Sequence, residues 1–134
     1  MNWTNKPPLF AKWVFWIAGV YGLLVLSPFY FLEKQIGVDQ PPPITHPEFF
    51  YGFIGCALAF QVAFLIIGAD PVRYRALMIP SVIEKFSYGI ACLALQSQGR
   101  LPGVVMIFAG IDLLLGVLFV ASYLMTRKGQ GSEK

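Results

Sequence analysis

Four stretches of this chain are long and apolar enough to cross the hydrocarbon core of a bilayer, which takes about 20 residues. They run over residues 13–32, 46–68, 76–95 and 101–125. Only 13% of the 134 residues are charged, where a soluble domain has about 25%. A soluble fold of this length could not bury so much apolar surface. We therefore expect an integral membrane protein.

Short links between the last three stretches make them antiparallel neighbours. The sequence thus predicts an all-α fold, a four-helix up-down bundle in one domain over residues 1–128, with a disordered tail at 129–134. The first stretch is long, lacks an obvious cleavage site and is followed by three more, so we expect it to be retained rather than removed as a signal peptide.

The basic residues predict how the bundle is oriented, because cytoplasmic loops of membrane proteins are enriched in lysine and arginine. With the N-terminus inside, two of the ten lie outside, Lys34 and Arg100, and Lys85 lies within a span. The other seven lie inside: Lys6, Lys12, Arg73, Arg75, Arg127, Lys128 and Lys134. We therefore expect both termini in the cytoplasm.

Local signals predict how the helices begin and how the longest loop is shaped. Residues 45–48, Thr-His-Pro-Glu, fit the T-x-x-E capping box, with Thr45 as the N-cap of the second span. Asp70 followed by Pro71 predicts another helix start. The loop over residues 33–45 contains three consecutive prolines, so we expect it to be partly extended and stiff.

Four polar residues fall near the middle of the spans. At a rise of about 1.5 Å per residue, Gln61 and Glu84 lie at a similar depth, and Asp112 lies close to the level of Tyr88. A charged side chain at the bilayer centre costs about 2.5–3.5 kcal/mol even on the most lenient scale, so these groups are expected to face neighbouring helices rather than lipid.

Lys85 directly follows Glu84 and is rotated from it by about 100° around the helix, so we expect the two side chains to point in different directions. Two arrangements are open for Lys85. Its ammonium extends toward the inner headgroups, or it turns toward Asp112 and forms an ion pair between helices.

Three interpretations of this polar layer remain open. A Glu84–Tyr88–Gln61 network and an Asp112–Lys85 pair could simply hold the helices together. The layer could be a proton, ligand or substrate site, or it could contact another membrane subunit. The candidate ligand-binding residues are Gln61, Glu84, Lys85, Tyr88 and Asp112.

Other signals are weaker or exclude whole classes of function. His46 is the only histidine, and no cluster of metal ligands, phosphate loop or nucleophile elbow is present, so we expect no metal, no cofactor and no nucleic-acid partner. A stripe of small residues is expected to let helices approach closely: Gly52, Gly55, Ala59 and Ala63, with Gly110 and Gly116 in the last span. Aromatic residues near the span ends are typical of an interfacial belt: Trp13, Trp16, Tyr30, Phe49, Phe50, Tyr51 and Tyr123.

The run GADPVRYRALMIPSVIEKFSYG, followed by IDLLLGVLFVASYL, resembles a group of uncharacterised small bacterial four-helix membrane proteins. The general plan also resembles the DoxX-like and sigma-2-receptor-like four-helix groups, the latter with intramembrane carboxylates. The resemblance implies a multi-pass protein of the bacterial inner membrane. Relatives of the sigma-2-like group are sterol isomerases whose acids lie in a membrane cavity, so it also implies a cavity of that kind.

The leading functional hypothesis is a small membrane protein that is not an enzyme and binds a lipid-like or cationic small molecule in a cavity within the bundle. The alternatives are an accessory subunit of a larger membrane complex, a membrane enzyme on a lipid-soluble substrate with Glu84 and Asp112 as acid and base, and a small proton-coupled exporter. The expected partners of the protein are the lipid bilayer, a lipid or small apolar ligand, and other membrane subunits.

Overall fold

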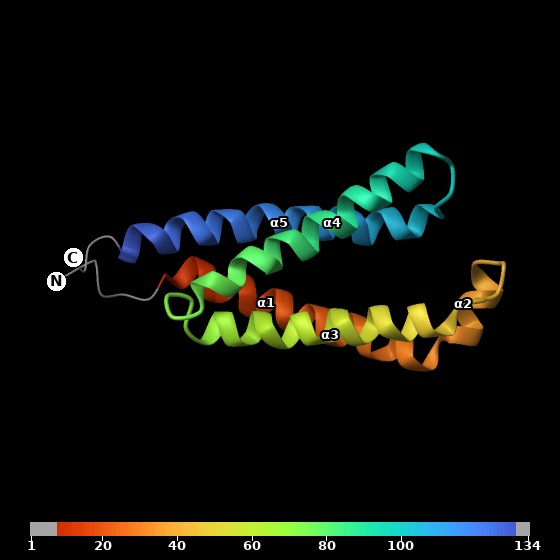
Figure 1. Ribbon diagram of the computed structural model, residues 1–134, viewed down its shortest axis with the longest axis horizontal. Helices are drawn as coiled ribbons and strands as arrows, with labels where there is room; N and C mark the ends of the chain where they lie inside the picture. The colour runs from red at the N-terminus through yellow and green to blue at the C-terminus, as the bar shows by residue number, and fades with distance from the viewer. Residues whose placement is uncertain (1–7, 131–134) are drawn as a thin grey trace.

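The computed structural model describes residues 8–130, and the side chains of residues 8–126. Within this part of the chain every regular element is helical (Figure 1). Five are α-helices: α1 (Leu9–Leu26), α2 (Glu33–Asp39), α3 (Pro47–Ala69), α4 (Met78–Ser97) and α5 (Gly103–Gln130). Two short 3₁₀ helices, η2 (Ser27–Phe31) and η3 (Arg75–Leu77), extend α1 and precede α4.

Four of these segments are long and apolar enough to cross a membrane: Leu9–Phe31, Pro47–Ala69, Arg75–Ser97 and Gly103–Thr126. They coincide with the four predicted stretches to within a few residues, and the predicted all-α class is confirmed. By length and composition, then, the chain is of the multi-pass membrane class. α5 continues to Gln130, and the rest of the expected tail, residues 131–134, lies outside the described residues.

The predicted capping box before α3 is wrong. The helix begins at Pro47, its N-cap is His46, and no side chain caps its first amides. Proline suits the first helical position because its missing N–H would have no partner there. It also keeps the residue before it out of the helical conformation, so Thr45 falls one position outside the helix. Glu48 Oε1 instead lies 3.3 Å from Nδ1 of His46.

The turns on either side of α4 have side-chain and backbone caps. Before it, Oδ1 of Asp70 accepts a hydrogen bond of 3.1 Å from the backbone N–H of Arg73, which tightens the turn at Pro71. After it, Gly99 has a φ of 68°. The N–H of Arg100 bonds the carbonyl of Leu95, and the N–H of Gly99 bonds that of Gln96. This pair of bonds is a Schellman motif, which glycine permits because it lacks a Cβ.

The loop predicted to be extended is helical in its first half. α2 spans Glu33–Asp39, and Nε2 of Gln35 donates to Oδ1 of Asp39 at 2.9 Å, one turn along. Tyr51 of α3 donates a hydrogen bond of 2.7 Å to Oε2 of Glu33, which holds the start of α2 against α3. The loop was predicted to be only partly extended, and its helical part ends before the prolines at 41–43.

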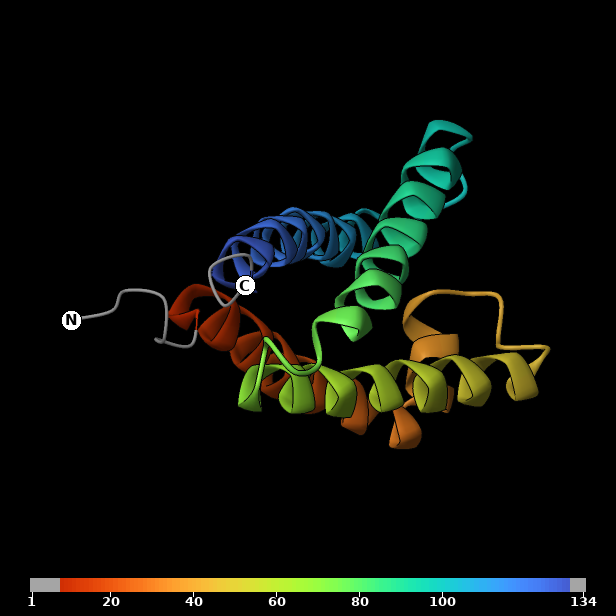
Figure 2. The same ribbon diagram turned by 60° about the vertical axis from the view of Figure 1, so that its left-hand side comes forward.

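The long helices associate in two pairs, α1 with α3 and α4 with α5 (Figures 1 and 2). α1 also packs on α5, whereas α3 and α4 contact each other sparsely. The pairs lie close together where α3 ends and α4 begins, here called the Arg73 end, and diverge toward α2, here called the α2 end (Figure 2). The backbones of the two pairs are therefore farther apart at the α2 end than at the Arg73 end.

Glycines permit the close packing within each pair. A Cβ on Gly19 of α1 would lie 2.9 Å from the carbonyl oxygen of Gln61, and one on Gly89 of α4 would lie 2.5 Å from Cδ2 of Leu113. The predicted stripe of small residues contributes less. A Cβ on Gly52 or Gly110 would meet nothing within 4 Å, so neither makes a close approach, whereas one on Gly116 would lie 3.0 Å from the Phe86 ring.

Three phenylalanines from three helices close the bundle toward the Arg73 end. Phe15, Phe64 and Phe119 come from α1, α3 and α5, and each is fully buried. The rings of Phe15 and Phe119 stack with centroids 4.1 Å apart, and Phe64 meets Phe119 edge-on at 4.9 Å. This triad belongs to the buried hydrophobic core.

Candidate functional site

A cavity of about 300 Å³ lies between the two helix pairs. Every long helix contributes to its wall, together with η2 and α2 at one end. Nineteen residues line it: Tyr21, Gly22, Val25, Leu26, Phe29, Ile36, Gln40, Phe50, Phe53, Ile54, Ala57, Gln61, Glu84, Lys85, Tyr88, Val104, Val105, Phe108 and Asp112. The cavity therefore extends from α2 to the middle of α4 and α5.

The structure brings all five candidate ligand-binding residues to this one cavity. Gln61 comes from α3, Glu84, Lys85 and Tyr88 come from α4, and Asp112 comes from α5. Most of the remaining wall is aliphatic or aromatic. The cavity is thus amphipathic, with its charged groups gathered on α4 and α5.

Lys85 is the centre of the charged group. Its Nζ lies 3.2 Å from Oδ1 of Asp112, to which it donates a hydrogen bond across the α4–α5 interface. It also lies 3.5 Å from Oε2 of Glu84, close enough for an ion pair although no hydrogen bond forms. The ring of Phe64 lies 5.3 Å from the same ammonium, within the range of a cation–π contact. One cation thus serves two carboxylates.

Of the two arrangements left open for Lys85, the structure shows the ion pair with Asp112. Only 6% of the Lys85 side chain is exposed, so it does not extend to the headgroups. The expectation that the Lys85 and Glu84 side chains point in different directions was wrong for their charged ends, which lie 3.5 Å apart. Their Cα–Cβ bonds diverge, but a four-carbon stem lets the ammonium reach back to its neighbour.

Gln61 is held in one orientation by its own helix and by Gly22. Its Nε2 donates a hydrogen bond of 2.9 Å to the carbonyl oxygen of Ala57, one turn earlier. A Cβ on Gly22 of α1 would collide with the Gln61 carboxamide, so this side chain occupies the place that a larger residue would fill. Its Oε1 is buried and has no hydrogen-bond partner.

The expected Glu84–Tyr88–Gln61 network does not form. Among the described side chains no hydrogen bond joins any two of these three residues, and Oε2 of Glu84 is buried without a donor in hydrogen-bond geometry. Two buried acceptors on the cavity residues, Oε1 of Gln61 and Oε2 of Glu84, are therefore unsatisfied. Each such group costs free energy that a donor would recover.

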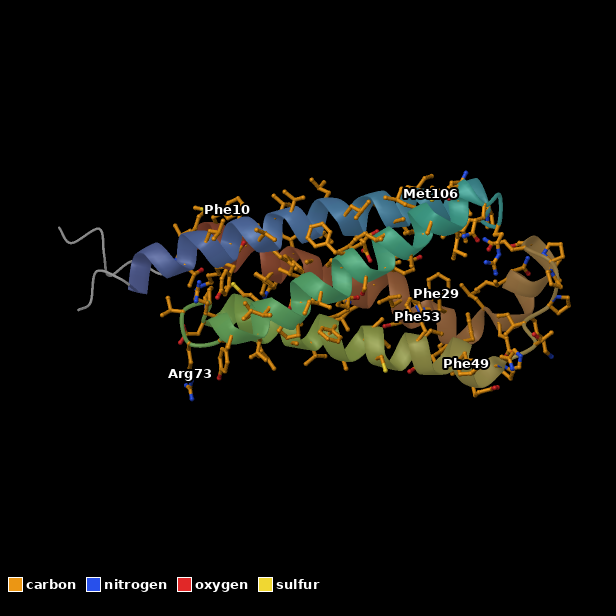
Figure 3. The ribbon with its side chains drawn as sticks, turned by 45° about the horizontal axis from the view of Figure 1, so that its top comes forward. Phe10, Phe29, Phe49, Phe53, Arg73 and Met106 are labelled. Atoms are coloured by element: carbon orange, nitrogen blue, oxygen red, sulfur yellow. The ribbon has the colours of Figure 1, made fainter. Side chains whose placement is uncertain are left out.

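Aromatic side chains form the wall on the α2 side of the charged group. The rings of Tyr88 and Phe53 stack with centroids 6.0 Å apart and join α4 to α3. Phe29 of η2 and Phe53 lie near each other between the helix pairs, whereas Phe49 lies at the α2 end (Figure 3). Phe50 and Phe108 complete this aromatic wall.

Of the aromatic wall, the sequence predicts only Tyr88 as a site residue. It predicts Phe50 for the interfacial belt and gives no site role to Phe29, Phe53, Phe108 or Gly22. Phe50 and Phe53 stand one turn apart in α3, and this i, i+3 spacing is the one signal that could have grouped them.

The described residues offer few groups for other chemistry. Among residues 8–130 no three His, Cys, Asp or Glu side chains lie close enough together to hold a metal ion. Both cysteines are free thiols, with Cys56 exposed and Cys92 buried. The arrangement is suited to holding a molecule, with an apolar part among the aromatic rings and a polar part beside Glu84 and Gln61.

No protein-family model, curated protein or solved structure matches this chain.

Proposed function

We propose that this protein binds a small amphipathic molecule, lipid-like or cationic, in the cavity between its two helix pairs. The ligand places its polar end beside Gln61, Glu84, Lys85 and Asp112 and its apolar part among Phe29, Phe53 and Phe108. The observation that carries the proposal is that these four polar side chains, Tyr88 and an aromatic wall line one cavity.

The size of the cavity supports a small ligand. A volume of about 300 Å³ is at the lower end of the range for small-molecule sites, about 300–1,000 Å³. A complete two-chain lipid does not fit within it, whereas a single polar head with a short apolar part does.

The charges and hydrogen-bonding groups favour a ligand whose polar end donates hydrogen bonds. Counted as ionised, Glu84 and Asp112 bring two negative charges and Lys85 one positive charge, which leaves one negative charge in excess. The unsatisfied atoms, Oε1 of Gln61 and Oε2 of Glu84, are both acceptors. An ammonium or hydroxyl group supplies the missing donors, and an ammonium also balances the charge.

We also propose that the four helices cross the bacterial inner membrane as an up-down bundle with both termini in the cytoplasm. Lys12, Arg73 and Arg75 support this orientation by the positive-inside rule, since α1 begins and α4 is entered at the same end of the molecule (Figure 1). In this arrangement Glu84 and Asp112 are intramembrane carboxylates, as the resemblance to the sigma-2-receptor-like plan implies. Fusions of a reporter protein after residue 40 and after residue 130 test this orientation. The reporter after residue 40 should lie on the outer side of the membrane, and the reporter after residue 130 should lie in the cytoplasm.

Ligand binding is tested with three probes that share an apolar part and differ at the polar end: phenylpropylamine, phenylpropanol and phenylpropionate. The thermal stability of the purified protein in detergent is measured with each. We expect stabilisation by the amine, less by the alcohol and none by the carboxylate. If none of the three stabilises the protein, the proposal fails.

Glu84→Gln is the matched variant, because it removes the charge and keeps the shape of the side chain. We expect the variant to fold and to lose the preference for amine over alcohol while alcohol binding remains. Glu48→Gln is the control, since Glu48 is exposed at the start of α3 and does not line the cavity. Equal responses of the two variants would count against a role for Glu84 in binding.

A further inference from the structure

The wall of the cavity is unequal on its two sides. α3 lines it from Gln61 outward to Phe50, and α5 lines it from Asp112 outward to Val104. α4 lines it only at Glu84, Lys85 and Tyr88, although the helix continues to Ser97. On the α2 side of Tyr88, α4 therefore contributes nothing to the wall.

The reason is the direction of α4. It crosses α5 at an angle while packing on it, and it leaves α3, with which it makes sparse contact (Figure 2). The stacked rings of Phe53 and Tyr88 are an aromatic contact that joins the two helices. The region between α3 and α4 on the α2 side of this ring pair is here called the open seam. If α4 crosses a membrane, the open seam faces lipid.

We propose that the ligand is a single-chain amphiphile taken from the bilayer, whose chain leaves the cavity through the open seam and extends into the lipid. This inference rests on the proposed function and names its ligand class. The head binds beside Glu84 and Gln61, the first methylenes contact Phe53 and Phe108, and the rest of the chain never leaves the hydrocarbon phase.

The cavity volume and the residues at the seam support this arrangement. About 300 Å³ accommodates a head and a short part of a chain but not a long chain. Toward the α2 end, two residues of α4 flank Tyr88 on opposite sides of the helix: Cys92, about 40° around and buried, and Ala91, about 60° around. Ala91 is exposed, and its single methyl cannot close the seam. A closed cavity of this size would reject long chains, whereas an open one accepts them.

A series of n-alkylamines from butylamine to hexadecylamine distinguishes the two cases. The protein is studied in lipid nanodiscs, each amine is supplied at the same mole fraction in the bilayer, and the shift in melting temperature is measured. The same series on Glu84→Leu gives the effect of the amines on the bilayer itself, which is subtracted. We expect the specific shift to rise over the shortest chains and then stay level, because further methylenes lie in lipid whether the amine is bound or free.

Ala91→Trp tests the exit of the chain directly, and Ala94→Trp is its matched control. Ala94 is also exposed on the same helix, but it is rotated about 120° from Tyr88 and lies off the seam. We expect Ala91→Trp to weaken hexadecylamine binding at least about tenfold and to leave butylamine binding unchanged, while Ala94→Trp changes neither. Ala91→Phe serves in the same way if the larger ring prevents folding.

The outcomes separate this inference from the proposed function. A specific shift that disappears beyond a certain chain length shows a closed cavity and overturns the open seam, while binding itself stands. Equal effects of Ala91→Trp and Ala94→Trp on the series also overturn it. If no amine of any length produces a specific shift, the proposed function fails as well.

Discussion

Lys85 and Asp112 join α4 to α5 through an ion pair in which Nζ lies 3.2 Å from Oδ1, with only 6% and 17% of the two side chains exposed. Glu84 shares the same ammonium at 3.5 Å. Charges shielded to this degree are held by their partners, because an unpaired charge in an apolar medium costs several kcal/mol. The pair therefore fixes the charged part of the cavity wall and also the register of α4 on α5.

A double-mutant cycle on this pair should show strong coupling. Asp112→Leu leaves Lys85 with Glu84 alone, and we expect it to lower the free energy of unfolding by about 3 kcal/mol. Lys85→Met should be similarly costly because it leaves two carboxylates without a cation. The double variant replaces the pair by apolar groups, so it should lose less than the sum by at least about 1 kcal/mol. Unfolding in mixed micelles measures these differences, and additive losses would contradict the pairing.

Gly22→Ala should destabilise the protein through Gln61. The new methyl would occupy the space of the Gln61 carboxamide and force it away from the carbonyl of Ala57. We expect a loss of about 1–3 kcal/mol, as for other overpacked sites. Thermal melting measures it.

Gly52→Ala is the control for that substitution. Its Cβ would meet nothing within 4 Å, so only the gain in helix preference applies, about 0.5–1 kcal/mol. Adding Gln61→Ala to Gly22→Ala should recover part of the loss. A Gly22→Ala variant as stable as Gly52→Ala would show that the carboxamide moves freely.

The sequence predicted those features of the fold that depend on one helix alone, namely the length of its apolar run and the rise per residue along its axis. The four apolar helices follow from apolar length, and the similar levels of Gln61, Glu84 and Asp112 along their helices follow from the helical rise, which agrees with their lining one cavity. The start of α3 could not be predicted from its capping pattern, because Pro47 decides it locally. The aromatic wall could not be predicted either, since it depends on the angle at which the helix pairs diverge, a property of packing across the whole molecule.

Tyr51→Phe should release α2 from α3. The Tyr51 hydroxyl donates the hydrogen bond of 2.7 Å that ties Glu33 to the start of α3. α2 itself is only seven residues long. Helices this short are not stable alone. We therefore expect faster amide hydrogen exchange over residues 33–39, with the exchange of the rest of α3 unchanged.

Tyr30→Phe is the matched control for this change. The Tyr30 ring stacks on Tyr51 with centroids 6.0 Å apart, but its hydroxyl makes no hydrogen bond within the described part of the chain. Removing that hydroxyl should leave exchange in α2 as it is. If both variants accelerate exchange equally, the aromatic stack and not the hydrogen bond holds α2.

Arg75→Lys should loosen the Arg73 end of the bundle, although it keeps the charge. The Arg75 guanidinium lies 3.5 Å from the centroid of the Tyr123 ring, and its Nε donates a hydrogen bond of 3.3 Å to the backbone carbonyl of Tyr123. These contacts tie η3 to α5. A lysine cannot reproduce a planar group that stacks and donates at once, so we expect a loss of about 1 kcal/mol of stability, the usual size of one hydrogen bond.

Arg73→Lys provides the comparison for Arg75→Lys. Arg73 is exposed, lies 5.3 Å from the Tyr74 ring and points away from the bundle at its end (Figure 3). The same substitution there keeps the charge and breaks no contact with another helix, so the melting temperature should stay as in the wild type. Melting curves of the two variants in the same detergent decide the matter. Equal curves would mean that charge alone, and not the stacked and hydrogen-bonded guanidinium, is what this end of the molecule requires.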